Sequence, residues 1–326
     1  MQSPRLLVLA TGGTIAGQAD SATRRDYRPG QIAIGDFLQQ VAALGLAAQL
    51  SGQQIANIGS EDIGPEIWAR LHADIAAAIA DPAVDGVIVT HGTDTAEETA
   101  FLLDQTLPTS KPLVMVGAMR PADAVGSDGL RNFANAVRVA GDAQAGGRGV
   151  LLVMSDNVIA ARDARKARTV GTNAFRGYPR DGIAMVTPSS LEWFGAPWRN
   201  GEDARFPFPA AFPDVPILHA YAGMGAAAVE RLVASGAQGI VLAGMGDGNA
   251  PGCVRDALAE AARSGIAVVR SSRVDEGLVD RNADDDVAGF VAARALGPAK
   301  ARILLQLLVA AGQRDPAVQQ AAFDRR

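Results

Sequence analysis

Two glycine loops that carry threonine have the residue types needed for chemistry. The first loop, 11–17 (TGGTIAG), follows the apolar run 6–10. The second loop, 90–95 (THGTDT), follows the apolar run 87–89. Each places a hydroxyl where a buried parallel strand should end, and open α/β sheets build their sites at that edge. Together the two loops predict an enzyme with a threonine nucleophile.

The first loop places Thr14 directly after two glycines. Gly12 and Gly13 can take positive φ and let the backbone approach a ligand closely. Free N–H groups at the following turn would hold the oxyanion that forms when the Thr14 hydroxyl attacks a carbonyl. A phosphate-binding turn is the alternative, although the loop lacks the P-loop ending and the glycine spacing of dinucleotide sites. This loop alone leaves both interpretations open.

The second loop places Thr93 beside Asp94. A threonine hydroxyl is a weak nucleophile at neutral pH and needs a base or a proton relay. Histidine is scarce and we expect His91 to be structural, so the sequence does not support a Ser-His-Asp triad. Lys166 follows the apolar run 151–154, and if buried it could act as the base or pair with Asp94. On spacing alone, a surface lysine is the simpler interpretation.

Two further stretches have the composition of ligand-contacting loops. The polar stretch 18–30 carries Tyr27. It is either a lid that closes over a substrate, with Tyr27 relaying the threonine proton, or a plain surface loop. The stretch 244–249 (GMGDGN) combines flexible glycines with Asp and Asn, which fits a ligand contact and a tight turn equally well.

The composition excludes several classes of function. The net charge of −5 gives no reason to expect nucleic acid or an anionic membrane as a partner. Cys253 is the only cysteine, so an intrachain disulfide and a cysteine-based zinc site are both excluded. The apolar run 6–10 is too short for a signal segment and is interpreted as a core strand. We expect a cytoplasmic protein, or a periplasmic one if a signal segment has been removed.

The elements that must position these loops alternate along the chain. Apolar runs and amphipathic stretches alternate up to residue 188, as in a mostly parallel sheet with helices on both faces. We expect strands at 5–10, 84–90, 112–117, 149–154 and 183–186. We expect helices at 34–44, 65–80, 96–107 and 130–143, and a further helix near Arg168. Residues 95–98 (TAEE) predict a capping box at the start of a helix.

A proline-rich stretch, 187–216, interrupts this alternation. Beyond it we expect strands at 217–220, 239–243, 266–270 and 289–292, and helices at 226–235, 253–264 and 299–311. Because 326 residues are many for one core, two domains are expected. The prediction is an α/β protein: a large N-terminal domain (1–188) with a mostly parallel sheet and flanking helices, a linker (189–215), and a smaller C-terminal α/β domain (216–326).

The sequence resembles the bacterial-type L-asparaginase family, nearest to the type II branch that includes the glutaminase-asparaginases. The resemblance covers nearly the whole chain. Its motifs are 10–17 (ATGGTIAG), 57–61 (NIGSE), 90–95 (THGTDT), 116–121 (VGAMRP) and 268–274 (VRSSRV). It implies hydrolysis of the side-chain amide of L-asparagine through a threonine acyl-enzyme, with side activity on L-glutamine and without metal or cofactor. It also implies a homotetramer of two intimate dimers, with the sites at the dimer interface.

The resemblance assigns roles to ten positions of this sequence. Thr14 matches the nucleophile and Tyr27 its partner in the lid. Thr93, Asp94 and Lys166 match the second threonine, the carboxylate and the lysine. The remaining positions match residues that hold the substrate or the oxyanion: Ser60, Glu61, Ala118 and, from the neighbouring subunit's C-terminal domain, Asn249 and Asp285.

Two departures from the family pattern bear on specificity. Some relatives have glutamine where this chain has Glu61, so a carboxylate here changes the charge near the substrate ammonium. The acidic residue of the neighbouring subunit falls in the run 284–286, from which we select Asp285. The cysteine pair of some secreted members is absent, which fits an intracellular protein.

Two other functions are compatible with the same scaffold. A non-catalytic amino-acid sensor would be expected to lack the nucleophile or the lysine, and both are present. An amidase subunit of a tRNA-dependent transamidation system would be expected to carry an RNA-binding domain or a basic face, and neither is evident. The preferred prediction is an amidohydrolase acting on a small-molecule amide.

Overall fold

A computed structural model describes residues 3–19, 27–28, 30–108, 110–198 and 204–325 of the chain. Contacts divide the chain into two compact units, Met1–Arg205 and Phe206–Arg326.

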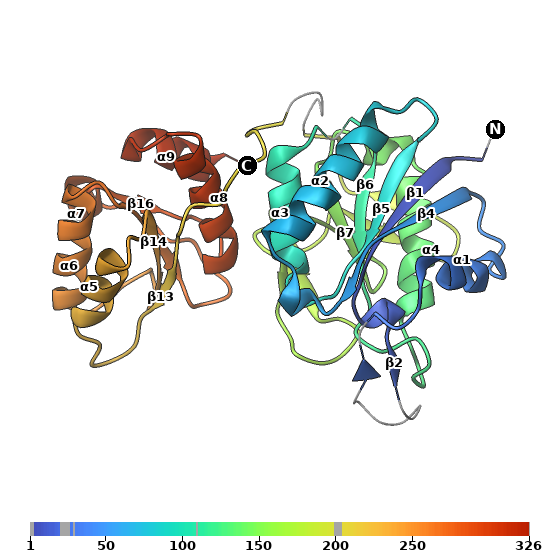
Figure 1. Cartoon of the computed structure of the whole chain (residues 1–326), viewed down its shortest axis with the longest axis horizontal. Helices are drawn as coiled ribbons and strands as arrows, with labels where there is room; N and C mark the ends of the chain where they lie inside the picture. Colours follow the sequence, from blue (N-terminus) through green and yellow to red (C-terminus); the bar gives the residue numbers. More distant parts are fainter. Residues whose placement is uncertain (1–2, 20–26, 29, 109, 199–203, 326) are drawn as a thin grey trace. The chain divides into compact units, whose positions relative to one another are not determined.

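The N-terminal unit is organised around an eight-stranded sheet in its described residues, with the order β12-β11-β8-β7-β6-β5-β1-β4 (Figure 1). The parallel part consists of β4 (Gln49–Ile58), β1 (Arg5–Gly12), β5 (Gly86–Thr90), β6 (Leu113–Val116) and β7 (Val150–Met154). An antiparallel extension consists of β8 (Asn157–Ala160), β11 (Ala184–Val186) and β12 (Leu191–Trp193). The antiparallel extension was not predicted as such from the sequence. Of the parallel core, β1, β5, β6 and β7 were predicted and β4 was missed.

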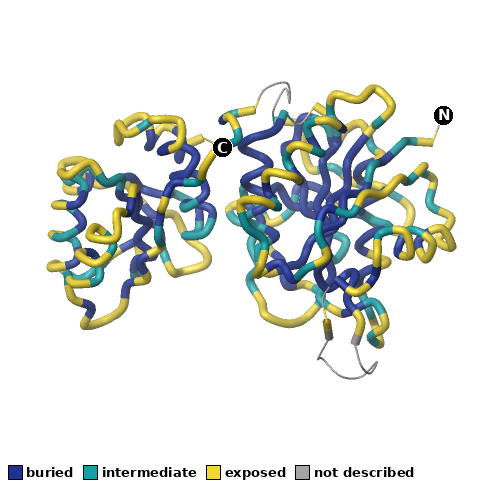
Figure 2. The backbone as a smooth tube through the Cα atoms, viewed as in Figure 1, coloured by how far each residue is buried: buried dark blue, intermediate teal, exposed yellow. Residues whose placement is uncertain are grey.

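Helices cover both faces of this sheet because side chains alternate along each buried strand. One face packs against α1 (Ile34–Ala42) and α4 (Gly129–Ala140), and Phe37 and Phe133 meet there edge to face at 5.0 Å. The other face packs against α2 (Pro65–Ala80) and α3 (Ala96–Thr106). The central strands are buried on both sides (Figure 2), which explains their continuous apolar sequences.

Shorter elements surround the sheet. Next to β1 are η1 (Thr14–Ala16) and the paired β2 (Gln18–Ala19) and β3 (Tyr27–Arg28). Further along are η2 (Ser60–Asp62), η3 (Ala143–Ala145) and a hairpin of β9 (Ala164–Lys166) and β10 (Phe175–Gly177). The helix predicted near Arg168 is therefore wrong, since the chain there leaves β9 and turns back into β10.

The C-terminal unit has a four-stranded parallel sheet in the order β13-β14-β15-β16. Its strands are β13 (Ile217–His219), β14 (Gly239–Gly244), β15 (Ala267–Ser272) and β16 (Phe290–Ala292). Its helices are α5 (Ala227–Ala234), α6 (Gly252–Arg263), α7 (Ala283–Ala288), α8 (Pro298–Ala310) and α9 (Pro316–Asp324). The mixed α/β class, with one large and mainly parallel sheet and one smaller parallel sheet, is as the sequence predicts.

The predicted linker overlaps folded structure. Residues 189–215 include β12, which pairs with β11 of the N-terminal unit, and the contacts divide between Arg205 and Phe206.

None of the helices in the described ranges has the length and apolar character that crossing a bilayer requires.

Candidate active site

The first threonine loop begins where β1 ends. Gly12 and Gly13 have φ of +105° and +78°, a region that favours glycine. The Gly13 N–H donates to the Ile58 carbonyl at 2.9 Å, which ties the loop to the end of the neighbouring strand β4. Thr14 then opens η1 and is buried, 4% exposed. The loop thus holds the Thr14 backbone in one conformation at the carboxyl edge of the sheet.

Glycines let three loops meet at this edge. A Cβ atom added to Gly13 would lie 2.4 Å from Gly92 Cα, and one added to Gly92 would lie 2.8 Å from Ser60 Oγ. Any larger residue at either position would push the loops apart. The loops that carry Thr14, Thr93 and Ser60 are therefore in direct backbone contact.

Lys166 joins the second threonine to the carboxylate. Its Nζ donates to Thr93 Oγ1 at 2.8 Å and to Asp94 Oδ1 at 2.5 Å. The Lys166 side chain is 17% exposed, whereas the Asp94 side chain is 61% exposed. The lysine is therefore not the surface lysine that its spacing alone suggested. Because Thr93 Oγ1 accepts from the ammonium, its own proton can be directed elsewhere, which is the arrangement of a proton relay.

The short helix η2 is bonded to the second loop. Ser60 Oγ accepts from the Asp94 N–H at 3.1 Å, and Thr95 Oγ1 donates to the Ser60 carbonyl at 2.7 Å. The Thr95 side chain makes no cap hydrogen bond to its own helix, so the predicted capping box is wrong. Ser60 is buried, and Glu61 beside it is exposed. The polar side chains of Ser60 and Glu61 therefore lie on the segment bonded to the Asp94 loop.

His91 supports the second loop from beneath and is fully buried. Its Nδ1 bonds the Gly92 carbonyl at 2.6 Å and its Nε2 bonds Thr99 Oγ1 at 3.0 Å. A carbonyl can only accept, so Nδ1 carries the proton and Nε2 accepts from Thr99. Burial lowers the pKa of His91 to about 4, against the opposing effect of the bond to Gly92. The imidazole is neutral at pH 7 and is committed to structure, as expected.

Sequence reasoning missed the rest of this support. Trp68 Nε1 on α2 donates to Thr99 Oγ1 on α3 at 2.9 Å, which extends the chain of hydrogen bonds that ends at Gly92. The pair is 31 residues apart, and no local pattern marks it.

The loop after β6 adjoins the second threonine loop. A Cβ on Gly117 would lie 2.7 Å from the His91 carbonyl oxygen and 3.1 Å from Thr93 Cγ2. Ala118, which follows, is fully buried. The Ala118 peptide is therefore adjacent to the loop that carries Thr93.

Tyr27 lies at the margin of the described residues. Its backbone belongs to β3 and pairs with Ala19 of β2. Its side chain lies outside what the structure describes, and so do residues 20–26 and 29 of the predicted lid. The lid and the role of Tyr27 stay predictions.

Asn249 lies in the C-terminal unit. It closes the loop after β14 through two backbone hydrogen bonds with Met245, both at 2.7 Å. Its residue surface is exposed. The stretch 244–249 therefore forms a tight turn, which was one of its two interpretations. A contact of Asn249 with substrate stays a prediction.

Asp285 is placed inside the C-terminal unit and is 3% exposed. Its Oδ1 accepts from Arg255 Nη2 at 3.0 Å, and its Oδ2 accepts from Asn282 Nδ2 at 2.6 Å and pairs with Arg270. Both carboxylate oxygens are therefore occupied within its own unit. A contact of Asp285 with the substrate of a neighbouring subunit stays a prediction.

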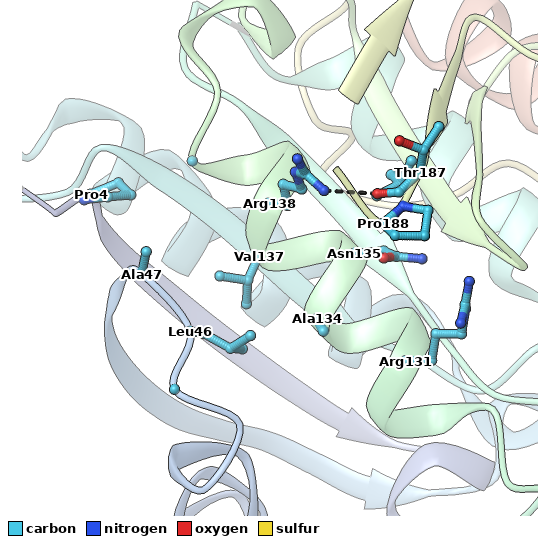
Figure 3. Close-up of a pocket in the computed structure, with 13 residues that line it drawn as sticks. Pro4, Leu46, Ala47, Arg131, Ala134, Asn135, Val137, Arg138, Thr187 and Pro188 are labelled. Carbon is cyan, nitrogen blue, oxygen red and sulfur yellow. Dashed lines mark hydrogen bonds between the residues drawn. The ribbon is translucent and has the colours of Figure 1, made fainter. Parts of the chain in front are cut away.

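A cavity of about 570 Å³ lies apart from these residues, between α4 and the segment that follows β11. Arg138 donates to the Thr187 carbonyl at 2.9 Å at its edge, and Figure 3 marks this hydrogen bond with a dashed line. Leu46 and Val137 also line the cavity. Arg131 at its margin is paired with Asp156. No residue predicted from the sequence to take part in chemistry lines this cavity, so the threonine loops remain the candidate site.

Comparisons with known proteins match both units. The family profile described as "Asparaginase, N-terminal" matches residues 5–199, and "Glutaminase/Asparaginase C-terminal domain" matches residues 214–323. The chain is 40% identical to "Probable L-asparaginase periplasmic" of Haemophilus influenzae, covering 98% of this chain and 93% of that protein. It is 40% identical to "L-asparaginase 2" of Escherichia coli, with 97% and 92% covered.

A further relative and a solved structure are also similar to the chain. The chain is 38% identical to "Glutaminase-asparaginase" of Pseudomonas fluorescens, with 97% of this chain and 89% of that protein covered. The crystal structure of a "Probable Cytoplasmic L-asparaginase" from Campylobacter jejuni superimposes with a TM-score of 0.92 at 36% identity, with 98% and 99% covered.

Proposed function

Since the chain belongs to the bacterial-type L-asparaginase family, we propose how its own residues carry out the family's reaction. The protein is an amidohydrolase that converts L-asparagine to L-aspartate and ammonia. L-Glutamine is proposed as its second substrate, because a relative of similar identity is named a glutaminase-asparaginase. The substrate is a small-molecule amide.

The proposed chemistry has two steps with Thr14 as the nucleophile. In the first, Thr14 Oγ1 bonds to the amide carbon, the carbon–nitrogen bond breaks, and the threonine proton leaves with the nitrogen as ammonia. In the second, water hydrolyses the acyl-threonine ester, which releases L-aspartate and restores the hydroxyl. Tyr27 is proposed to relay the threonine proton, and the Ala118 peptide to stabilise the oxyanion.

The observation that carries the proposal is the contact between Lys166 Nζ and both Thr93 Oγ1 and Asp94 Oδ1. Thr93 and Asp94 lie on the loop that touches the Thr14 loop through Gly13 and Gly92, and Lys166 reaches that loop from the end of β9. An ammonium that holds a hydroxyl by its oxygen leaves that hydroxyl's proton free for a leaving amide. This supports Thr93, Asp94 and Lys166 as the relay that activates the reaction at Thr14.

Substrate is proposed to bind by its charged backbone groups. Ser60 and Glu61 would hold the α-carboxylate and the α-ammonium, with Asp94 sharing the ammonium. Ser60 Oγ already accepts from the Asp94 N–H, so its own proton is available to a carboxylate. The high exposure of Asp94 is consistent with a group that waits for a charged ligand.

The assembly and compartment are proposed as well. We infer a homotetramer built from intimate dimers, with Asn249 reaching the site of the neighbouring subunit. We infer a cytoplasmic location, although the relatives' names include both "periplasmic" and "cytoplasmic".

Ammonia release from L-asparagine and L-glutamine, measured side by side, tests the proposal. We expect the Thr14→Ala variant to be folded and to lose ammonia release by at least about 10³-fold, because it lacks the nucleophile. Thr106→Ala is the matched control: it is also buried, but its hydroxyl donates to the Leu102 carbonyl within α3. Full activity in Thr14→Ala would overturn the proposal. So would tight binding of L-aspartate without turnover of either amide by the native chain.

A further inference from the structure

Asp128 precedes α4 at the position of an N-cap residue, yet its side chain caps none of the N–H groups in the first turn of that helix. An aspartate there ordinarily accepts from the N–H groups of the first turn. The Asp128 carboxylate instead accepts from Met119 N–H, 3.1 Å from each oxygen, and from Arg120 N–H at 3.0 Å. The buried carboxylate is thus directed at the loop that follows β6.

Asn132 holds the same loop from one turn further along α4. Its Nδ2 donates to the Gly117 carbonyl at 3.0 Å and to Asp128 Oδ2 at 2.9 Å, and its Oδ1 accepts from the Ser155 N–H at 3.1 Å. The residue is 1% exposed. Asp128 and Asn132 together fix three successive parts of the loop 117–120: one carbonyl and two N–H groups.

The loop 117–120 contacts the second threonine loop directly, and the start of α4 connects it to the first threonine loop. Gly117 lies against His91 and Thr93, because a Cβ there would be 2.7 Å from the His91 carbonyl oxygen and 3.1 Å from Thr93 Cγ2. Gly129, the first residue of α4, lies against Ile15 and Ala118: a Cβ there would be 3.3 Å from Ile15 Cγ1 and 3.6 Å from Ala118 Cβ. The start of α4 is therefore packed between the Ala118 loop and the turn that carries Thr14.

The hydrogen bonds to Asp128 and Asn132 do not use the N–H group of Ala118. The N–H groups of Met119 and Arg120 and the carbonyl of Gly117 are all committed to Asp128 and Asn132. Ala118, between them, is not among the bonds to either side chain. Charge-assisted hydrogen bonds from N–H groups to a buried carboxylate are strong, so the peptides on either side of Ala118 have little freedom.

We propose that Asp128 and Asn132 are positioning residues for the hydrolysis, which hold the loop 117–120 at a fixed distance from Thr14 and Thr93. This rests on the proposed function, in which the Ala118 peptide stabilises the oxyanion. Displacement of an oxyanion donor by about 1 Å can lower a rate by about 100-fold. Substrate binding at Ser60, Glu61 and Asp94 is carried by other loops and is not affected.

The test compares the steady-state kinetics of Asp128→Ala, Asp128→Asn and the control Asp142→Ala with L-asparagine. Asp142 caps η3 by accepting from Gln144 N–H at 2.8 Å, far along the chain from the threonine loops, so its loss removes an aspartate cap without touching the loop. We expect kcat of Asp128→Ala to fall about 10- to 100-fold with KM changed less than about threefold. Asp128→Asn keeps one acceptor oxygen and should recover part of kcat. The control should keep kcat within about twofold.

Amide hydrogen exchange supplies a readout that does not depend on activity. In Asp128→Ala the amides of Met119 and Arg120 should lose protection, while those of Met115 and Val116 in β6 keep theirs. If Asp128→Ala does not fold, Asn132→Ala takes its place, with the same split between kcat and KM expected. A kcat equal to that of Asp142→Ala, or a rise in KM with kcat unchanged, would overturn the inference.

The outcomes for the two proposals are distinguishable. Native protein that hydrolyses L-asparagine while the Asp128 and Asn132 variants match the control would refute the inference and leave the function intact. Native protein that does not hydrolyse L-asparagine would refute both the function and the positioning role, even if exchange showed that Asp128 holds the loop.

Discussion

Each unit of the molecule has an ion pair beside the loops that follow its parallel strands, and the two pairs differ in what they leave accessible. Lys166 and Asp94 of the N-terminal unit have side chains that are 17% and 61% exposed, whereas Arg270 and Asp285 of the C-terminal unit are 1% and 4% exposed. The first pair also binds a threonine hydroxyl. The second binds backbone carbonyls and an asparagine.

The difference in exposure indicates which charged side chains a ligand can reach. Arg270 donates to the carbonyls of Asp247 and Asp280, both at 2.8 Å, and so ties the Asn249 loop to the segment before α7. Its charge is used within the fold. Asp94 has most of its side-chain surface open, so a substrate ammonium can reach it. We propose that this difference in exposure separates the pair that takes part in the reaction from the pair that stabilises the fold.

The largest effect expected from this comparison is on the rate. Lys166→Met removes the ammonium that holds Thr93 and Asp94 but keeps the length of the side chain. Ammonia release should fall about 10³-fold, because a relay group contributes about 10² to 10⁴ to the rate. The midpoint of urea unfolding should change little, since Asp94 can be hydrated once it is unpaired. Activity within tenfold of the native protein would contradict the assignment.

The reverse pattern is expected in the C-terminal unit. Asp285→Ala leaves two arginines without their carboxylate, one of them fully buried, and should lower the free energy of unfolding by about 3–5 kcal/mol. Asp286→Ala is the matched control, because Asp286 pairs with Arg281 at the surface and should cost at most about 1 kcal/mol. Urea unfolding measures both. An equal loss in the two variants would mean that burial does not distinguish the pairs.

A smaller effect is expected in the pH dependence of stability. The pKa of His91 is lowered to about 4 in the folded protein, so the unfolded chain binds a proton first as pH falls. Stability should therefore decrease from about pH 6.5 to about pH 4, by roughly 3 kcal/mol for this group, and level off below. His91→Gln cannot take up this proton and should remove that part of the slope. An unchanged slope in urea titrations at pH 7, 5.5 and 4.5 would argue against a neutral buried His91.

Four of the five parallel strands could be predicted from the sequence because they are apolar on both faces. The fifth, β4, is polar and largely exposed along its length, and it was missed. The antiparallel strands β8, β11 and β12 are short and were not recognised beyond the run 183–186. The helix predicted near Arg168 follows from a composition of alanine and arginine, which favours helix. Pairing of Lys166 with Phe175 across the hairpin overrides that local preference.

The site was only partly predictable for a similar reason. The threonine loops are local patterns, but the partners of Lys166 are 72 and 73 residues away, so its burial depends on how β9 packs. Thr95 has the sequence of a helix cap, yet it bonds Ser60, 35 residues away. Asp128 likewise follows no local rule, since its carboxylate bonds the loop before it. Spacing identifies candidate groups, and tertiary packing decides what each one contacts.

The central claim is that Thr14 is acylated by the amide while Lys166, Thr93 and Asp94 converge on it. Rapid acid quenching of the native protein during turnover of L-asparagine, followed by mass spectrometry of its peptides, tests this directly. The account predicts an aspartyl adduct on the peptide that contains Thr14, absent when that residue is alanine. An adduct on another residue, or ammonia release undiminished in the Thr14→Ala variant, would contradict it.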